Sequence, residues 1–316
     1  MKILVTGAAG FIATSLIPKL VAQNHQVVGV DSLVSQTTNQ QFTENICSHH
    51  FFDINDSGRL EELLSGVDVV FHLAAKGNVI ESVENPLANF NSNVSSTLSL
   101  LEAMRNKGCQ KIIFSSTGGA LMGDACPPVN ESTLPKPISP YGASKLACEG
   151  YLSAYMGSYG FSSIVLRFGN VYGPFSSHKV GVINKWIRAL FESNDLVIYG
   201  DGTASRDYIH VDDLTNGLML ALERLARFVA PTLETYHLAN HSEITLGQLS
   251  EILLGCSLEE KLSSNIIHRP ARTGEVSRNF ADITLARNNL GFVPKVKFVD
   301  GISDLYKWIG SNEYKK

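Results

Sequence analysis

The stretch KILVTGAAGFIA, residues 2–13, decides the fold. Its first half, KILVT, carries consecutive branched apolar residues, which predict a short strand that is buried on both faces. Gly7 and Gly10 follow at once, and Ala13 takes a third small position at the start of an apolar, helix-like stretch. A strand that runs through a glycine turn into a helix indicates the first unit of a parallel α/β sheet.

The glycine turn also has the chemistry of an anion site. Gly7 permits a tight turn, and Gly10 lets a diphosphate approach the backbone where the helix N–H groups and dipole favour negative charge. We assign Phe11 and Ile12, the next two residues, to the same cradle. The spacing G-x-x-G-x-x-A differs from G-x-G-x-x-G, so a dinucleotide site has to be supported by the rest of the chain.

The first half of the chain repeats the alternation of strand and helix. Further strands are expected at 26–30, 49–54, 67–73, 111–116 and 162–168, and helices at 11–23, 57–65, 86–107 and 141–158. After residue 169 the alternation of strand and helix becomes less regular. Helical stretches are expected there near 180–192, 211–227, 246–254 and 299–309. This pattern predicts an α/β protein with a Rossmann-type doubly wound parallel sheet in residues 1–168. Residues 169–316 would form a smaller mixed α/β substrate-binding lobe, with segments that return to the first domain.

Carboxylates at strand ends indicate which dinucleotide would bind. Asp31 ends the second predicted strand, 24 residues after Gly7, where it can accept hydrogen bonds from a ribose 2′,3′-diol. A carboxylate there repels a 2′-phosphate, so NAD is favoured over NADP. Asp53, after the third strand, could face the adenine or be an exposed loop residue. We assign four neighbours of these strand ends to the cofactor cleft as well: Ile54, Leu73, Ala74 and Ala75.

The pentapeptide YGASK, residues 141–145, supplies a candidate acid–base centre. Tyr141 and Lys145 share a helix face, because residues four apart lie one turn from each other. A nearby ammonium is expected to lower the pKa of a tyrosine and so make it a better base. Thr117, just past the fifth strand, could hydrogen-bond a reacting oxygen, with Ser116 as the competing assignment. The small residues inside the pentapeptide would let ligands pack close to the helix.

These motifs together resemble one family. TGAAGFIA, DI at 53–54, FHLAA at 71–75, FSSTGG at 114–119, YGASK and LRFGNVYGP at 166–174 stand in the order seen in extended short-chain dehydrogenase/reductases. The chain is most similar to the UDP-galactose and UDP-N-acetylglucosamine type of nucleotide-sugar C4-epimerases. The resemblance implies an NAD-dependent isomerase that acts on a UDP-sugar through a 4-keto intermediate, and a homodimer that pairs through helices 86–107 and 141–158.

The resemblance also implies where the sugar nucleotide binds. Asn170 would touch the diphosphate, and two arginines of the second lobe, Arg206 and Arg272, would clamp it. Asn279 takes the position that is bulky in enzymes restricted to plain hexoses, which favours N-acetylhexosamine substrates, alone or with plain hexoses. Two loop residues, His178 and Lys179, are further substrate candidates. Met122 stands where the family usually has a tyrosine, and could reshape the site.

Four alternatives remain open at this point. A UDP-uronic acid 4-epimerase or a 4-keto reductase would use a similar site. A nucleotide-sugar 4,6-dehydratase is disfavoured, because Thr117 is followed by Gly118 and Gly119 where those relatives carry an Asp-Glu pair for elimination. A non-catalytic NAD-binding sensor is disfavoured because such proteins tend to lose the Tyr/Lys pair.

Composition excludes several other classes. Among the 316 residues, 44% are hydrophobic and 18% charged, as in ordinary soluble domains. A net charge of −4 argues against a nucleic-acid partner. The five cysteines are scattered without metal-type spacing, which favours free thiols, no metal site and a cytoplasmic location. No apolar run is long enough to cross a membrane, and the N-terminus does not resemble a signal peptide.

Overall fold

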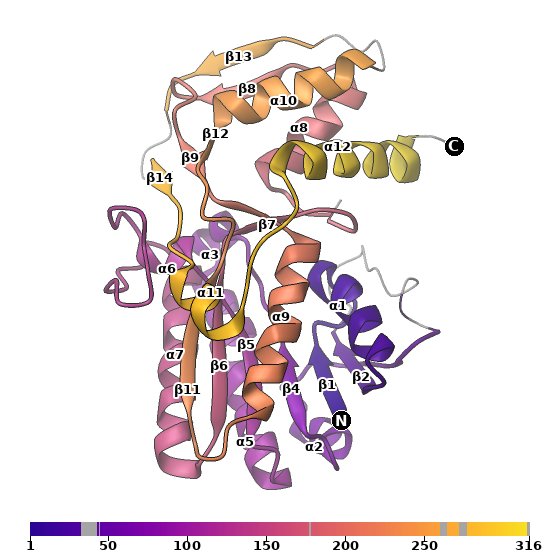
Figure 1. The fold of residues 1–316 in the computed structure, drawn as a ribbon, viewed down its shortest axis with the longest axis vertical. Helices are drawn as coiled ribbons and strands as arrows, with labels where there is room; N and C mark the ends of the chain where they lie inside the picture. The colour runs from indigo at the N-terminus through magenta and orange to yellow at the C-terminus, as the bar shows by residue number, and fades with distance from the viewer. Residues whose placement is uncertain (33–42, 44, 177, 260–263, 272–276, 315–316) are drawn as a thin grey trace.

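Seven parallel strands form the central sheet of the computed structural model, which describes residues 1–32, 43, 45–176, 178–259, 264–271 and 277–314 (Figure 1). Their order across the sheet is β11-β6-β5-β4-β1-β2-β3, and every adjacent pair is parallel. The strands are β1 (Lys2–Thr6), β2 (Gln26–Asp31), β3 (Ser48–Phe51), β4 (Val69–His72), β5 (Lys111–Thr117), β6 (Ser162–Phe168) and β11 (Leu233–Leu238). The strand order reverses between β1 and β4, and ligands of open α/β sheets bind beside such a reversal, at the carboxyl ends.

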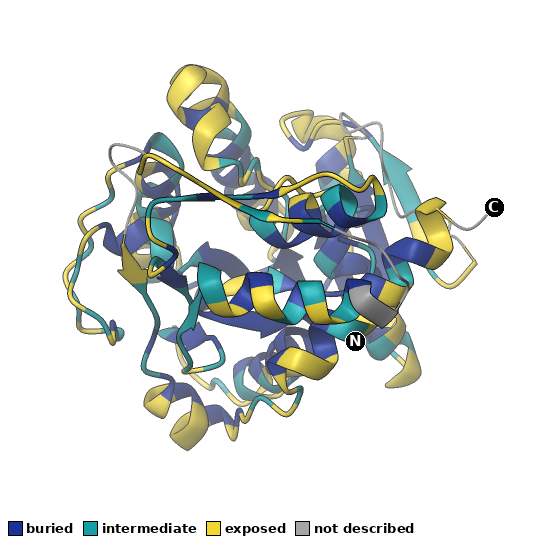
Figure 2. Ribbon diagram, turned by 90° about the horizontal axis from the view of Figure 1, so that it is seen from above, coloured by how far each residue is buried: buried dark blue, intermediate teal, exposed yellow. Residues whose placement is uncertain are grey.

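Successive residues of each strand enter two different cores, as the two-residue period requires. In β1, Ile3 and Val5 join a core with helices α1 (Phe11–Ala22), α9 (Val211–Ala226) and α11 (Thr284–Leu290). Leu4 joins the opposite core, with helices α2 (Ser57–Leu64), α5 (Ser96–Lys107) and α7 (Pro140–Tyr159). Figure 2 shows the buried residues gathered on the strands and on the inward sides of these helices. The sheet is therefore covered on both faces.

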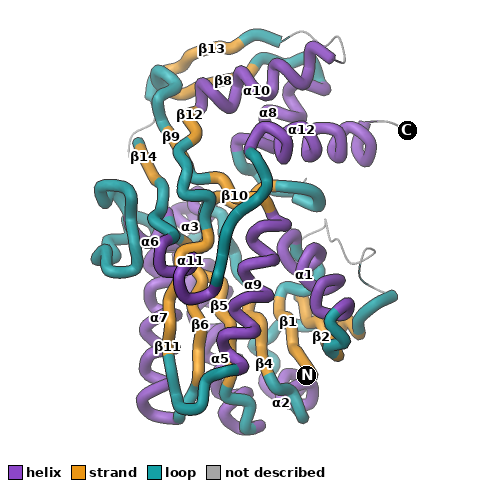
Figure 3. The backbone as a smooth tube through the Cα atoms, viewed as in Figure 1, coloured by secondary structure: helices purple, strands orange, loops and turns teal. Residues whose placement is uncertain are grey.

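A smaller lobe lies beyond the carboxyl ends of the sheet, at the top of Figures 1 and 3. It packs helices α8 (Val182–Phe191), α10 (Leu246–Glu259) and α12 (Phe298–Ile309) around a third apolar core, beside the paired strands β8 (Leu196–Tyr199) and β13 (Ile266–Arg269). Short strands connect the lobe to the sheet: β7 (Asn170–Tyr172) pairs with β10 (Tyr208–His210), and β9 (Ser205–Arg206) pairs with β12 (Ile244–Thr245) and β14 (Arg278–Asn279). The site is built between this lobe and the sheet.

The predicted fold class is confirmed, and one strand was missed. The helix expected over 86–107 is confirmed as a continuous helical segment, in which a π-helical turn η2 (Asn91–Ser95) lies between α4 (Pro86–Phe90) and α5. Single π-helical turns of this kind occur inside α-helices. Strand β11 was not predicted, although it extends the main sheet beside β6. The division at residue 168 stays a prediction.

Four short elements complete the described chain. They are α3 (Val79–Glu84), η2, α6 (Gly119–Met122) and the π-helical turn η3 (Gly310–Tyr314). In the part of the chain that the structure describes, no helix combines the length and apolar character needed to cross a bilayer.

Candidate active site

The glycine turn after β1 is shaped by close backbone packing. Gly7 has φ +70°, and a Cβ atom there would lie 2.8 Å from the main-chain nitrogen of Ala74, at the end of β4. Glycine is therefore required at position 7 both by the positive φ and by the close approach of the Ala74 main chain. The Ala9 N–H donates to an Asp31 carboxylate oxygen at 3.0 Å, so Asp31 holds the turn, and its contact with a ribose stays a prediction.

The start of α1 fits a diphosphate. The helix begins after Gly10, which has extended backbone geometry and no capping side chain, and its first turn carries no acidic residue. Phe11 is buried and Ile12 half-buried at this end. A helix start without a side-chain cap is where an anion can take the place of the cap. The residues present thus fit the dinucleotide that the sequence predicts.

The other predicted cofactor residues occupy different surroundings. Asp53 is exposed, and its carboxylate accepts from the main chain and the side chain of Asn55 at 2.9 and 2.8 Å. The Ile54 side chain is buried in the core beneath α2 and α5, and its contact with the cofactor stays a prediction. Leu73 and Ala74 are half-buried at the end of β4, and Ala75 is exposed.

Tyr141 lies in the first turn of α7, beside the end of β5. Its main-chain N–H donates to Ser82 Oγ of α3 at 3.2 Å. Burial raises the pKa of Tyr141 to about 12, and a side-chain hydrogen bond with Thr117 acts in the opposite direction. We expected Lys145 to lower the pKa of Tyr141. That expectation is wrong, because desolvation of the phenolate raises this pKa by more than the neighbouring protein groups lower it.

Lys145 is buried one turn further along α7. Its ammonium donates to the main-chain carbonyl of Ser115 at 2.8 Å and lies 4.7 Å from the centre of the Phe114 ring. Burial lowers the pKa of Lys145 to about 8. An ammonium has three donors, so donors remain for a ligand after the Ser115 carbonyl is satisfied. The lysine is therefore held against β5, one helical turn from Tyr141.

The two neighbouring hydroxyls at the end of β5 have different partners. Ser116 Oγ donates to a carboxylate oxygen of Glu149 at 2.6 Å, and Glu149 also accepts two hydrogen bonds from buried Arg167, at 3.2 and 2.8 Å. Thr117 hydrogen-bonds Tyr141. This geometry favours Thr117 over Ser116 as the partner of the reacting oxygen.

Asn93 is a positioning residue that the sequence analysis did not single out. It lies in the π-helical turn η2, where its side-chain oxygen accepts from the Lys76 N–H at 2.9 Å and its amide donates to Ser144 Oγ at 3.0 Å. Ser144 in turn donates to the Tyr141 carbonyl at 2.8 Å. Asn93 thus ties the loop after β4 to the first turn of α7. The signal was an asparagine in a polar run inside a predicted helix.

The small residues of YGASK are explained by protein packing. A Cβ atom on Gly142 would lie 2.1 Å from the Ala120 carbonyl oxygen, so α6 takes up the space that we expected a ligand to use. Ala143 is exposed, and Ser144 is held by Asn93. That expectation is wrong for Gly142.

Asn279 lies over the turn that follows Thr117. Its side-chain oxygen is 3.3 Å from the position that a Cβ atom on Gly119 would take. Asn279 on β14 is also the register partner of Arg206 on β9. Two predicted substrate residues, 73 positions apart, are therefore adjacent in space beside the end of β5. Arg272 lies outside the described residues.

The remaining predicted substrate residues come from the strands and loop after β6. Asn170 is exposed on β7 and pairs with Tyr208. His178 is half-buried, and burial lowers its pKa. The Lys179 ammonium lies 5.1 Å from the centre of the Phe11 ring, at the start of α1. Met122, the last residue of α6, is fully buried in the core with α1 and α9, so it packs α6 against that core.

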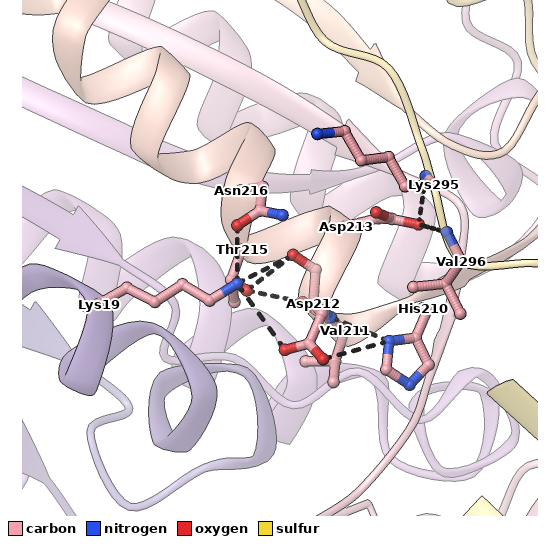
Figure 4. A network of polar contacts seen from close by, with 9 residues as sticks. All are labelled: Lys19, His210, Val211, Asp212, Asp213, Thr215, Asn216, Lys295 and Val296. Carbon is pink, nitrogen blue, oxygen red and sulfur yellow. Dashed lines mark hydrogen bonds and ion pairs between the residues drawn. The ribbon is translucent and has the colours of Figure 1, made fainter. Parts of the chain in front are cut away.

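A polar network fixes α1 against the start of α9 (Figure 4). Lys19 Nζ donates to the Asp212 carbonyl and to Asn216 Oδ1, at 3.1 and 2.8 Å. Asp213 accepts the N–H groups of Lys295 and Val296 at 3.0 and 2.8 Å. Helix α1 is thereby held to the start of α9, and α9 is held to the segment that leads into α12.

Comparison with known proteins agrees with this geometry. The NAD dependent epimerase/dehydratase family model matches residues 3–238. A UDP-glucose 4-epimerase of Mycolicibacterium smegmatis is 34% identical, over 96% of this chain and 96% of that protein.

Two solved structures are similar along nearly their whole length. The Thermotoga maritima UDP-glucose 4-epimerase with UDP-glucose has a TM-score of 0.90 and 32% identity, over 98% of this chain and 99% of that one. The Bacillus cereus UDP-glucuronic acid 4-epimerase, in complex with UDP-glucuronic acid and NAD, has a TM-score of 0.88 and 30% identity, over 98% and 99%. The matches confirm the predicted resemblance, the isomerase class and the cofactor NAD. This chain therefore belongs to the NAD dependent epimerase/dehydratase family.

Proposed function

We propose that the protein interconverts the C4 epimers of a UDP-hexose, with N-acetylhexosamine substrates favoured, alone or with plain hexoses. The observation that carries the proposal is the contact of Thr117 with Tyr141 at the carboxyl end of β5, beside the glycine turn. NAD, when bound, would supply a reversible acceptor for the C4 hydride, so the reaction would have no net redox change.

The chain's own residues move the proton. Tyr141 takes the proton of the sugar 4-hydroxyl as the C4 hydride leaves, and returns it when the hydride comes back to the other face of the sugar. Thr117 donates a hydrogen bond to the oxygen that becomes the ketone. Lys145, anchored on the Ser115 carbonyl, holds the ribose next to Tyr141. Gly118 and Gly119 offer no acid or base for elimination, which favours epimerisation over dehydration.

The sugar preference rests on Asn279. Its amide lies beside Gly119, where a shorter side chain than tyrosine leaves space for an N-acetyl group. Arg206, the register partner of Asn279, would contact the diphosphate through its paired guanidinium donors. A UDP-uronic acid is the alternative substrate, since the Bacillus cereus relative is named for that activity.

A panel of UDP-sugars, read by chromatography without added NAD, tests this function. We expect exchange of UDP-GlcNAc with UDP-GalNAc, and no exchange of UDP-glucuronic acid with its epimer. Tyr141→Phe should lower kcat by about a thousandfold or more, because a general acid–base residue contributes about 10²–10⁴-fold. Its NAD content should not change. Full activity of the Tyr141→Phe variant would contradict this mechanism. A folded protein that converts no UDP-sugar would instead favour a non-catalytic NAD-binding sensor.

The homodimer is a second part of the proposal. Helices α3 and α4 pack on α7 and expose five large apolar side chains, Val79, Ile80, Val83, Leu87 and Phe90, with 43–71% of their surface accessible. An exposed apolar patch of this kind marks a protein–protein contact. A second copy of the chain, pairing through helices 86–107 and 141–158, would cover it. Light scattering should give a dimer for the parent protein and a monomer for a Leu87→Asp, Val83→Asp variant.

A further inference from the structure

Lys179 places an ammonium from the second lobe at the start of α1. It lies in the loop between β7 and α8, and its Nζ is 5.1 Å from the ring centre of Phe11, the first residue of that helix. The sequence analysis assigned Lys179 to the sugar nucleotide. Its observed contact is with the Phe11 ring, at the start of the helix that follows the glycine turn.

The loop backbone holds Lys179 in this direction. Its N–H donates to the Ser176 carbonyl at 2.8 Å. The buried side chain of Asn184, on α8, donates to the carbonyls of Ser176 and Lys179 at 2.5 and 3.4 Å. Phe175 packs against Trp308 of α12, with ring centres 5.4 Å apart. The position of the ammonium therefore follows from a turn that α8 and α12 fix.

The charges around this ammonium do not balance. Within the described residues, no carboxylate or other hydrogen-bond acceptor is within bonding distance of Lys179 Nζ. Desolvation lowers the pKa of Lys179 to about 8, with no acidic residue acting against it, although the residue as a whole is exposed. The neighbouring helix start adds further positive potential, because it has no capping side chain and no acid in its first turn. An anion beside the helix start would be attracted both by the helix start and by the nearby ammonium.

We propose that Lys179 binds the diphosphate of NAD, so that the cofactor is held by both lobes. The α1 start donates main-chain N–H groups to the diphosphate from one side, and the Lys179 ammonium contacts it from the other. The sugar nucleotide's diphosphate is left to Arg206, which lies on β9 beside Asn279. An epimerase that returns its hydride gains from a cofactor that stays bound, and a cation carried by the substrate lobe strengthens that retention.

Calorimetric titration of the full chain, freed of nucleotide, tests the proposal without using activity. Lys179→Gln should raise the Kd for NAD by about tenfold, the size expected for one charge-assisted contact to phosphate. The Kd for ADP-ribose, which has the same diphosphate and no nicotinamide, should rise by the same factor. The Kd for UDP should change less than about twofold. Lys179→Arg should restore most of the NAD affinity, since it keeps the charge.

Lys185→Gln is the matched control, because it removes the same charge from an exposed position on α8. It should leave all three dissociation constants unchanged. The proposal is overturned if Lys179→Gln weakens UDP as much as NAD, or UDP alone, or neither, or if Lys185→Gln weakens NAD equally. Thermal unfolding of each variant shows that the fold is retained before the titrations are compared. These outcomes do not depend on which sugar the enzyme converts.

Discussion

Ser116 and Thr117 are adjacent in the chain, yet their hydroxyls have different partners. Ser116 Oγ donates to Glu149 at 2.6 Å, behind β5, whereas Thr117 hydrogen-bonds Tyr141 in the site. Both partners lie on α7, eight positions apart, so the helix engages the two neighbouring hydroxyls about two turns apart.

This pair gives a direct test of the hydroxyl assignment. Thr117→Val should lower kcat by about a hundredfold, the effect of removing one donor to a developing oxyanion. Ser116→Ala should keep kcat within about threefold and lower the free energy of unfolding by about 1–2 kcal/mol, since it removes a bond to a carboxylate. Steady-state kinetics and urea unfolding measure the two effects. Equal losses of kcat in both variants would contradict the assignment.

Gly142 and Gly150 belong to the same helix, α7, but meet different surroundings. A Cβ atom on Gly142 would lie 2.1 Å from the Ala120 carbonyl oxygen, whereas nothing lies within 4 Å of one on Gly150. Gly142→Ala should therefore cost about 2 kcal/mol or more of unfolding free energy by overpacking, and displace Tyr141. Gly150→Ala should stabilise the protein by about 1 kcal/mol, because alanine is the better helix former. Chemical unfolding of both variants checks this, and a stable, fully active Gly142→Ala protein would contradict it.

Two buried histidines make stability depend on pH. Burial lowers the pKa of His237 and of His72 to about 3, from 6.5. Between these values the unfolded chain binds the proton and the folded chain does not, so stability is lost as pH falls from about 6.5 toward 3. Each histidine should remove about 2 kcal/mol of unfolding free energy between pH 7.5 and 5, at about 1.4 kcal/mol per unit.

His237→Asn separates this effect from general acid sensitivity. The variant should show a loss smaller by about 2 kcal/mol over that pH range than the parent protein. Urea unfolding at pH 7.5 serves as the internal reference, because there the two proteins differ by packing and not by protonation. An unchanged pH slope would show that His237 is not kept neutral by burial.

The sequence predicted the parts of the site that lie near strand ends. The glycine turn, Asp31, Thr117 and Tyr141 follow from parallel strands whose carboxyl ends meet at one edge, and local pattern is enough to place those ends. The contact of Lys179 with Phe11 spans 168 positions and depends on how a loop of one lobe packs on a helix of the other. The same holds for Asn279 beside Gly119, where only the family resemblance gave a position.

The extent of burial is the other quantity that the sequence pattern could not predict. The spacing of Tyr141 and Lys145 predicted a shared helix face, and from that a lowered tyrosine pKa. In the structure Lys145 is buried and Tyr141 half-buried, and desolvation raises the pKa of Tyr141 to about 12 and lowers that of Lys145 to about 8. The loss of hydration depends on every element that covers the site, so it follows from the packed structure and not from a four-residue spacing.

Asn279 should set the sugar preference. Its side-chain oxygen lies 3.3 Å from where a Gly119 Cβ atom would be, so any larger group on β14 must extend over the turn after Thr117. Asn279→Tyr would fill that space. The ratio of kcat/KM for UDP-GlcNAc to kcat/KM for UDP-glucose should then fall at least about tenfold, within the range that a steric change in a pocket produces.

Two further variants make the test of Asn279 specific. Asn279→Ala removes the amide and adds no bulk, so it should keep the preference for the N-acetylated sugar. Arg278→Gln, at the exposed neighbour that pairs with Glu243 at 2.7 Å, should leave both kcat/KM values unchanged. If Asn279→Tyr lowers both sugars equally, the side chain contacts a part of the substrate that the two share, because a steric effect on the N-acetyl group alone must act on one sugar and spare the other.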